Sequence, residues 1–189
     1  MNKISRISSS TRMYRNLHKK AGIILLLLIL VSASTGILLG WKKNSMGYLQ
    51  AATAKGSSAD PSRWLPMDTL ISMAGRGLRD SVDPSLDLAI DRIDIRPEKG
   101  IAKFVYLHHF QSVQMDLSTG KVLGIEVRRS DWIEKLHDGS LLDYYIDAKG
   151  TPTKLIFTTA VGLGLLLLCF SGFWLWLNPR RIRKAKQNH

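Results

Sequence analysis

Two stretches decide the fold of this 189-residue chain: AGIILLLLILVSASTGILLGW (Ala21–Trp41) and LIFTTAVGLGLLLLCFSGFWLWL (Leu155–Leu177). Neither stretch contains a charged side chain. A bilayer core about 30 Å thick is spanned by about 20 helical residues, and a backbone inside lipid has to satisfy its own hydrogen bonds. The two stretches therefore predict two transmembrane helices. Asn178-Pro179 is expected to end the second helix, because proline removes a backbone donor.

The first stretch has a second interpretation as a cleaved signal peptide. Val31-Ser32-Ala33 is a small-residue site of the kind that a signal peptidase accepts. However, the apolar character continues to Gly40, beyond the core of about 7–15 residues found in signal peptides. We therefore expect an uncleaved membrane anchor.

The net charge of +12 is concentrated in the two tails, residues 1–20 and 178–189. These tails hold six and five basic residues and no acidic one, whereas residues 42–154 hold sixteen basic and all fifteen acidic residues. Short flanks rich in Lys and Arg stay in the cytoplasm, so both termini are expected inside a bacterial inner membrane and the middle segment in the periplasm. The tails suit the anionic surface of the lipid bilayer, and we reject a nucleic-acid partner.

Residues 42–154 are long enough for one small domain. Gln50 to Pro61 is polar and rich in small residues, which predicts a linker. Apolar residues at helical spacing predict a helix that starts near Met67 and ends between Gly75 and Arg79. Strands are predicted at residues 86–95, 101–107, 112–117 and 122–127. This order predicts an α+β domain with a small antiparallel sheet, followed by an interfacial amphipathic helix near residues 130–145.

Several short motifs give the chain a family resemblance. Met115 to Leu123, MDLSTGKVL, is similar to the last hairpin of a PepSY domain. The chain also resembles PepSY-associated transmembrane proteins, which place a basic residue, a Leu-His pair and a glycine before the first span and Thr-Gly late in it. The matching elements are Arg15, Leu17-His18, Gly22, Thr35-Gly36, Leu136-His137-Asp138-Gly139 and Ser171-Gly172-Phe173-Trp174-Leu175-Trp176. The resemblance runs from Arg15 to Pro179 and implies a minimal, two-span version of the family's fold.

The resemblance also implies a cofactor. Larger relatives are often called iron-regulated membrane proteins, and some resemble ferric-siderophore reductases that carry haem between helices. On this resemblance His18 and His137 are candidate ligands of haem b, because neutral imidazole is a usual haem ligand. The alternative is that both histidines fill polar positions at the membrane surface. The predicted topology places them on opposite sides of a bilayer about 30 Å thick, so each would need a partner from another chain.

Small residues in both stretches predict helix packing. Ser32, Gly36 and Gly40 recur every four residues, and Ala160 and Gly164 repeat this spacing in the second stretch. Such faces let helix backbones approach closely. They are compatible with packing of the two helices inside one chain and equally with a homodimer.

No motif for a catalytic metal, a phosphate loop or an activated nucleophile is present in the sequence. His108 and His109 are adjacent, and neighbouring residues of a regular strand point to opposite faces, so the pair cannot chelate one metal from such a strand. We therefore predict no catalytic residues, and a chain that is not an enzyme. Its expected role is to present the external domain to an envelope protein for binding or regulation, by strand addition at a sheet edge. The alternative is a haem-binding accessory subunit of a membrane electron-transfer system for ferric-siderophore reduction in iron uptake.

Overall fold

A computed structural model describes residues 3–187 of the chain and the side chains of residues 8–184. Of the basic residues in the tails, the side chains of Lys3, Arg6 and Lys186 lie outside this part. The chain forms two compact units: Leu38–Glu134, here called the sheet unit, and Met1–Ile37 with Lys135–His189, here called the helix unit.

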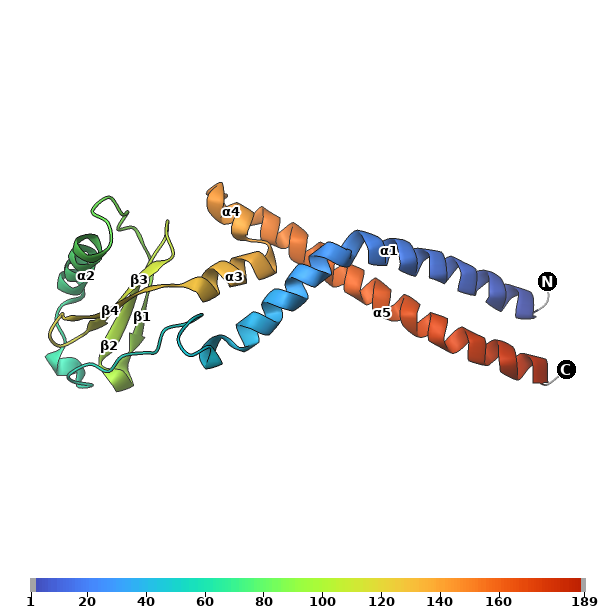
Figure 1. Cartoon of the computed structure of the whole chain (residues 1–189), viewed down its shortest axis with the longest axis horizontal. Coiled ribbons are helices and arrows are strands. Elements are labelled where there is room, and N and C mark those ends of the chain that lie inside the picture. Colours follow the sequence, from blue (N-terminus) through green and yellow to red (C-terminus); the bar gives the residue numbers. More distant parts are fainter. Residues whose placement is uncertain (1–2, 188–189) are drawn as a thin grey trace. The chain divides into compact units, whose positions relative to one another are not determined.

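The helix unit is dominated by two long helices, α1 (Lys3–Gly40) and α5 (Pro152–Gln187) (Figure 1). Each is long and apolar enough to cross a membrane, and only 11% of the apolar window of either helix is buried. A core helix of a soluble protein would be mostly buried. These two helices instead leave most of their apolar side chains exposed, which is typical of helices that face lipid. The two predicted spans are therefore confirmed as long apolar helices.

The prediction that Asn178-Pro179 ends the second helix was wrong, because α5 continues through Pro179 to Gln187. Proline removes one backbone donor, which is tolerated in membrane helices when the freed groups find other partners. Close to this point a guanidinium N–H of Arg180 donates to the Trp176 carbonyl oxygen at 3.1 Å. The Asn178 side chain, which is 1% exposed, donates across to the Thr11 hydroxyl at 2.9 Å.

Two short helices precede α5 in the region where one interfacial helix was expected. They are α3 (Arg129–Asp138) and α4 (Leu141–Tyr145). Gly139 separates them with φ of +80°, a left-handed conformation that favours glycine and commonly ends a helix.

The sheet unit contains a four-stranded antiparallel sheet in the order β1-β2-β3-β4 and a long helix that packs on it. The helix α2 spans Met67–Ser81, so it ends two residues beyond the predicted range. The strands are β1 (Ile90–Arg96), β2 (Ile101–Tyr106), β3 (Gln111–Asp116) and β4 (Val122–Val127). Together with the two long helices, this arrangement confirms the predicted fold class.

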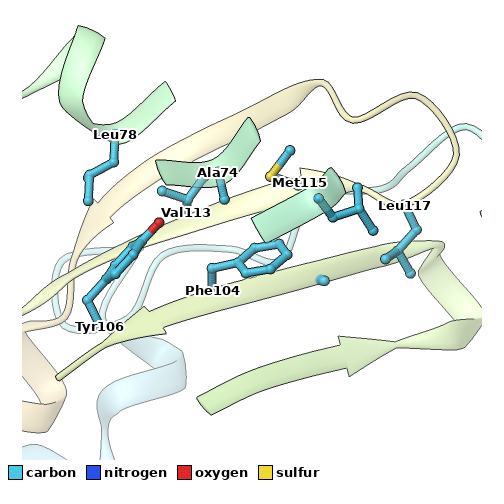
Figure 2. Close-up of a cluster of buried hydrophobic side chains, with 9 residues drawn as sticks. Ala74, Leu78, Phe104, Tyr106, Val113, Met115 and Leu117 are labelled. Carbon is cyan, nitrogen blue, oxygen red and sulfur yellow. The ribbon is translucent and has the colours of Figure 1, made fainter. Parts of the chain in front are cut away.

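The hydrophobic core lies between α2 and one face of the sheet. Figure 2 shows Ala74 and Leu78 of α2 above Phe104, Val113 and other core side chains of the sheet. The register explains this face, because Phe104 lies opposite Val113 across the β2–β3 pair. The alternation of apolar side chains along β2 and β3 thus places one set in the core.

The segment before α2 is fixed against the sheet, although its composition predicted a linker. The Gln114 side chain donates to the Ala52 carbonyl at 3.0 Å and accepts from the Ala54 amide at 2.9 Å. The Gly56 amide donates to the Lys99 carbonyl at 2.8 Å. These polar partners are far away in sequence, so the linker prediction could not include them.

Candidate functional site

The helices α1 and α5 pack antiparallel in the helix unit, and this packing builds the candidate site. Leu25 lies against Gly164 of α5, and Gly22 lies against Leu168. The residue numbers rise along one helix as they fall along the other, which is the pattern of antiparallel neighbours. Three more pairs continue it toward the chain termini: His18 with Ser171, Tyr14 with Trp174, and Thr11 with Asn178.

His18 contacts a buried hydroxyl of the facing helix. Its Nδ1 lies 2.8 Å from Oγ of Ser171, a residue that is 2% exposed. The single hydroxyl proton of Ser171 is used on its own helix, where Oγ lies 2.6 Å from the Leu167 carbonyl oxygen. The Nδ1–H of His18 therefore donates to Ser171, and Nε2 of the neutral ring keeps its lone pair.

His137, at the end of α3, makes the same kind of contact with a buried hydroxyl, but this hydroxyl belongs to α1 and not to α5. Its Nδ1 lies 3.0 Å from Oγ1 of Thr35 in α1, and Thr35 is 6% exposed. The Thr35 hydroxyl donates to the Val31 carbonyl at 2.6 Å. Nδ1 of His137 is therefore the donor, and its Nε2 is also left as an acceptor.

A glycine follows each hydroxyl residue and makes room for the imidazole. A Cβ added at Gly36 would lie 3.3 Å from Cε1 of His137, and one added at Gly172 would lie 3.4 Å from Cε1 of His18. Both rings thus lie close to the backbone of the helix that they contact. The hydroxyl-glycine pairs Thr35-Gly36 and Ser171-Gly172 are the site elements whose role sequence reasoning missed, although both pairs are present in the motifs.

The two histidines lie far apart along the helix pair. His137 contacts Thr35, which follows His18 by seventeen residues in one continuous helix. At a rise of 1.5 Å per residue this corresponds to roughly 25 Å. The imidazoles therefore belong to two separate sites, one near each end of the apolar helices.

Two carboxylates anchor α5 close to His137. Asp143 is 4% exposed, and its two carboxylate oxygens accept from the amides of Thr153 and Lys154 at 2.9 and 2.8 Å. Burial opposes ionisation of Asp143, but these hydrogen bonds outweigh it and lower its pKa. Asp138 pairs with the Lys154 ammonium at 2.6 Å. The two carboxylates therefore hold the segment after α3 to the first turn of α5.

The small residues that the sequence predicted to pack the two long helices do not all lie in a helix contact. Gly164 lies against Leu25. Gly36 lies against His137, and Ser32 donates to the His137 carbonyl at 3.4 Å. A Cβ at Gly40 would meet no described atom within 4 Å, and Ala160 is exposed. Part of this set thus contacts α3 or α5 of the same chain.

Replacing Gly164 by valine is expected to separate α1 from α5, since even a Cβ at this position would overlap Leu25. Overpacking of this kind lowers the free energy of unfolding by about 2 kcal/mol. Thermal unfolding of the full chain in detergent measures the effect. Gly162→Val is the matched control on the same helix, because a Cβ there meets no described atom within 4 Å. Equal melting of the two variants would contradict the packing.

The sheet unit holds a second polar cluster on the face opposite the core. Lys103 pairs with Glu126 at 2.9 Å, and the Ser112 hydroxyl donates to the same carboxylate at 3.3 Å. Arg128 pairs with Asp131 beside a small cavity of about 70 Å³. Oε2 of Glu126 is buried without a hydrogen-bond partner among the described residues. The cluster joins side chains of β2, β3 and β4 and so supports the register of these strands.

The two adjacent histidines, His108 and His109, lie in the loop between β2 and β3. Both approach Asp87: Nε2 of His109 lies 2.8 Å from its carbonyl oxygen, and Nε2 of His108 lies 3.6 Å from its carboxylate. A loop lets neighbouring side chains turn to the same partner, which a strand forbids. In the part of the chain that the structure describes, no group of three or more His, Cys, Asp or Glu side chains could hold a metal ion.

Comparison with known proteins gives one result that covers the length of the chain. Residues 2–178 match the family described as "PepSY-associated TM region". No curated protein and no solved structure matches the chain. The match includes both hydroxyl-glycine pairs and both histidines, together with α1, the sheet unit and α5 as far as Asn178. The sequence resemblance is therefore confirmed: the chain is a membrane protein that belongs to the PepSY-associated TM family.

Proposed function

We propose that this protein is a haem-binding subunit that passes single electrons across a bacterial inner membrane. The observation that carries the proposal is the repeated pair of imidazole and hydroxyl. Near each end of the helix pair, one histidine donates Nδ1–H to a buried hydroxyl and keeps the lone pair of Nε2.

The residues present fit a haem. Histidine ligands of metals usually donate the second ring nitrogen to a fixed acceptor, which sets the tautomer and orients the ring. Ser171 and Thr35 supply this acceptor, and Gly172 and Gly36 allow the rings to approach the helix backbone. When bound, haem iron would supply one-electron redox chemistry. His18 and His137 would hold it through Nε2, and the exposed apolar side chains of α1 and α5 would exclude water.

The distribution of charge supports a topology in which the two histidines lie toward opposite faces of the membrane. The basic tails favour a topology with both termini in the cytoplasm and the sheet unit in the periplasm. His18 then lies toward the cytoplasm and His137 toward the periplasm. Their separation of roughly 25 Å covers most of a bilayer core about 30 Å thick. An electron path between donors and acceptors on opposite sides of the membrane needs one site near each face.

Each end of the helix pair offers only one imidazole among the described residues, so we propose that a second copy of the chain supplies the other ligand. In a two-fold symmetric dimer, His18 of both copies would serve one site and His137 of both copies the other. The chain would then act as an electron carrier in an iron-uptake system and not as the catalyst that binds the siderophore.

Absorption spectroscopy of the purified full chain tests this function. Protein from haem-supplied cells is expected to show a Soret band and to contain about one haem per chain. His18→Ala and His137→Ala should each remove about half of the haem, and the double variant nearly all of it. His108→Ala in the β2–β3 loop is the control and should change nothing. A colourless protein, or one whose haem content survives in the double variant, would refute the proposal.

A second candidate function is protein binding by the sheet unit. Strand addition requires an edge strand without repelling charges. The edge strand β1 carries Asp91, Arg92 and Asp94, whereas the only charged residue of β4 is Glu126, which is paired with Lys103. The edge strand β4, whose single charge is already paired, therefore favours binding of an extended segment from an envelope protein.

Site-specific photo-crosslinking in living cells tests this second function. A crosslinking residue at Gly124 of β4 fits without overlap, because a Cβ there meets no described atom within 4 Å. One discrete crosslinked product is expected from position 124 and none from position 94 on β1. The same products from both positions, or none from position 124, would exclude binding at β4.

A further inference from the structure

The helix unit holds a cavity between the terminal parts of α1 and α5. It has a volume of about 410 Å³ and is lined by Ser8, Thr11, Arg12, Arg15, Pro179, Ile182 and Arg183. Asn178 joins the two helices beside it, since its side chain donates to the Thr11 hydroxyl at 2.9 Å. This is the end of the helix pair that holds both chain termini (Figure 1).

Three guanidinium groups line this cavity without a carboxylate partner. The sequence contains no Asp or Glu side chain before Asp60 or after Asp147. Within the described residues, Arg12, Arg15 and Arg183 make no ion pair and no cation–π contact, whereas the neighbouring Arg180 and Arg181 lie over the rings of Trp176 and Trp174. The cavity therefore concentrates three positive charges, and no described side chain supplies a carboxylate to pair with them.

We infer that this cavity binds the phosphate group of an anionic membrane lipid. Guanidinium groups present donors in a fork that matches phosphate oxygens, which distinguishes them from lysine ammonium groups. The basic cavity lies beside the apolar helices, where a lipid head group is present at high local concentration. Ser8 adds a hydroxyl, and Pro179 and Ile182 add an apolar wall suited to the acyl chains of a lipid.

Native mass spectrometry of the full chain in detergent, titrated with phosphatidylglycerol, tests the site. The three guanidinium groups would hold the phosphate through direct, charge-assisted hydrogen bonds, so Arg12→Gln/Arg15→Gln/Arg183→Gln is expected to weaken binding of the first lipid about 100-fold. The matched control is Lys19→Gln/Lys20→Gln/Lys184→Gln, which removes the same charge outside the cavity and should weaken binding less than about threefold. A triple Arg→Lys variant keeps the charge but loses the fork, and should fall between the two.

Several outcomes would overturn the inference. Equal weakening in the glutamine variant and its lysine control would show diffuse attraction between basic tails and lipid. Tighter binding of inorganic phosphate than of phosphatidylglycerol would assign the cavity to the free ion instead of the lipid. Circular dichroism checks that each variant keeps its helices. Full binding in a variant that keeps them but lacks the three arginines would exclude the cavity as the site.

Discussion

Replacing Asp116 by alanine is expected to lower the free energy of unfolding of the sheet unit by about 4 kcal/mol. Asp116 ends β3 and is 2% exposed. Oδ1 accepts from the amides of Ser118 and Thr119 at 2.8 and 3.3 Å. Oδ2 accepts from both the amide and the hydroxyl of Ser57. Alanine would leave these donors without their acceptor and release both the β3–β4 turn and the segment that precedes α2.

Hydrogen exchange of the full chain, followed by mass spectrometry, measures this effect in place. A loss of about 4 kcal/mol corresponds to exchange about 1000-fold faster in the peptides that cover β3 and β4. Asp94→Ala is the control, since Asp94 lies on β1 in an exposed pair with Arg92 at 3.4 Å. Such a surface pair contributes less than about 1 kcal/mol. Exchange that is unchanged in Asp116→Ala would contradict the assigned role.

The same carboxylate sets a pH dependence. Burial opposes ionisation of Asp116, but its hydrogen bonds outweigh burial and lower the pKa below the usual value of 3.8. Because the pKa is lower in the folded state, the ionised group stabilises the fold above pH 3.8, and this contribution is lost as pH falls through the folded-state pKa. The stability difference between the wild type and Asp116→Asn should therefore shrink below pH 3.8.

Replacing Gly139 by alanine is expected to lower the free energy of unfolding of the helix unit by about 3 kcal/mol. Backbone strain and overlap with a neighbouring side chain both contribute to this loss. Gly139 has φ of +80°, a conformation that a side chain disfavours by about 1–2 kcal/mol. A Cβ would in addition lie 2.6 Å from Cβ of Phe157. Because Gly139 follows His137 by two residues, the displaced end of α3 should also break the hydrogen bond to Thr35.

The control for Gly139 is Gly150→Ala, which separates strain from overlap. Gly150 has φ of +78°, and a Cβ there meets no described atom within 4 Å. This variant should show the backbone strain alone. Thermal unfolding in detergent gives the stability of both variants, and the rate of chemical modification of His137 reports its contact with Thr35. Equal results for the two variants would show that Phe157 does not constrain the end of α3.

The sequence alone predicted the elements whose signal is local. Twenty uncharged residues in a row define a membrane helix without reference to any other part of the chain. The alternation around Phe104 and Val113 likewise marks strands with one buried face, and the predicted last strand, residues 122–127, coincides with β4.

What the sequence could not predict depends on partners distant in the chain. The segment after Gln50 has the composition of a linker and is fixed only because Gln114 and Asp116 point to it. Pro179 is a local stop signal that the packed helix overrides. His18 and His137 were selected by resemblance, but their tautomers follow only from hydroxyls that lie more than one hundred residues away in sequence.

The helix α1 contributes a histidine to one site and a hydroxyl to the other, so its length between the two fixes their relation. Each residue of an α-helix turns about 100° and rises about 1.5 Å. One residue inserted between Leu26 and Leu30 would rotate Thr35 away from His137 while leaving every contact residue unchanged. Four inserted residues would nearly restore the direction of Thr35 but move it by about 6 Å. The number of residues between the Leu-His and Thr-Gly motifs therefore sets the geometry of both histidine contacts, even where the side chains in between are interchangeable.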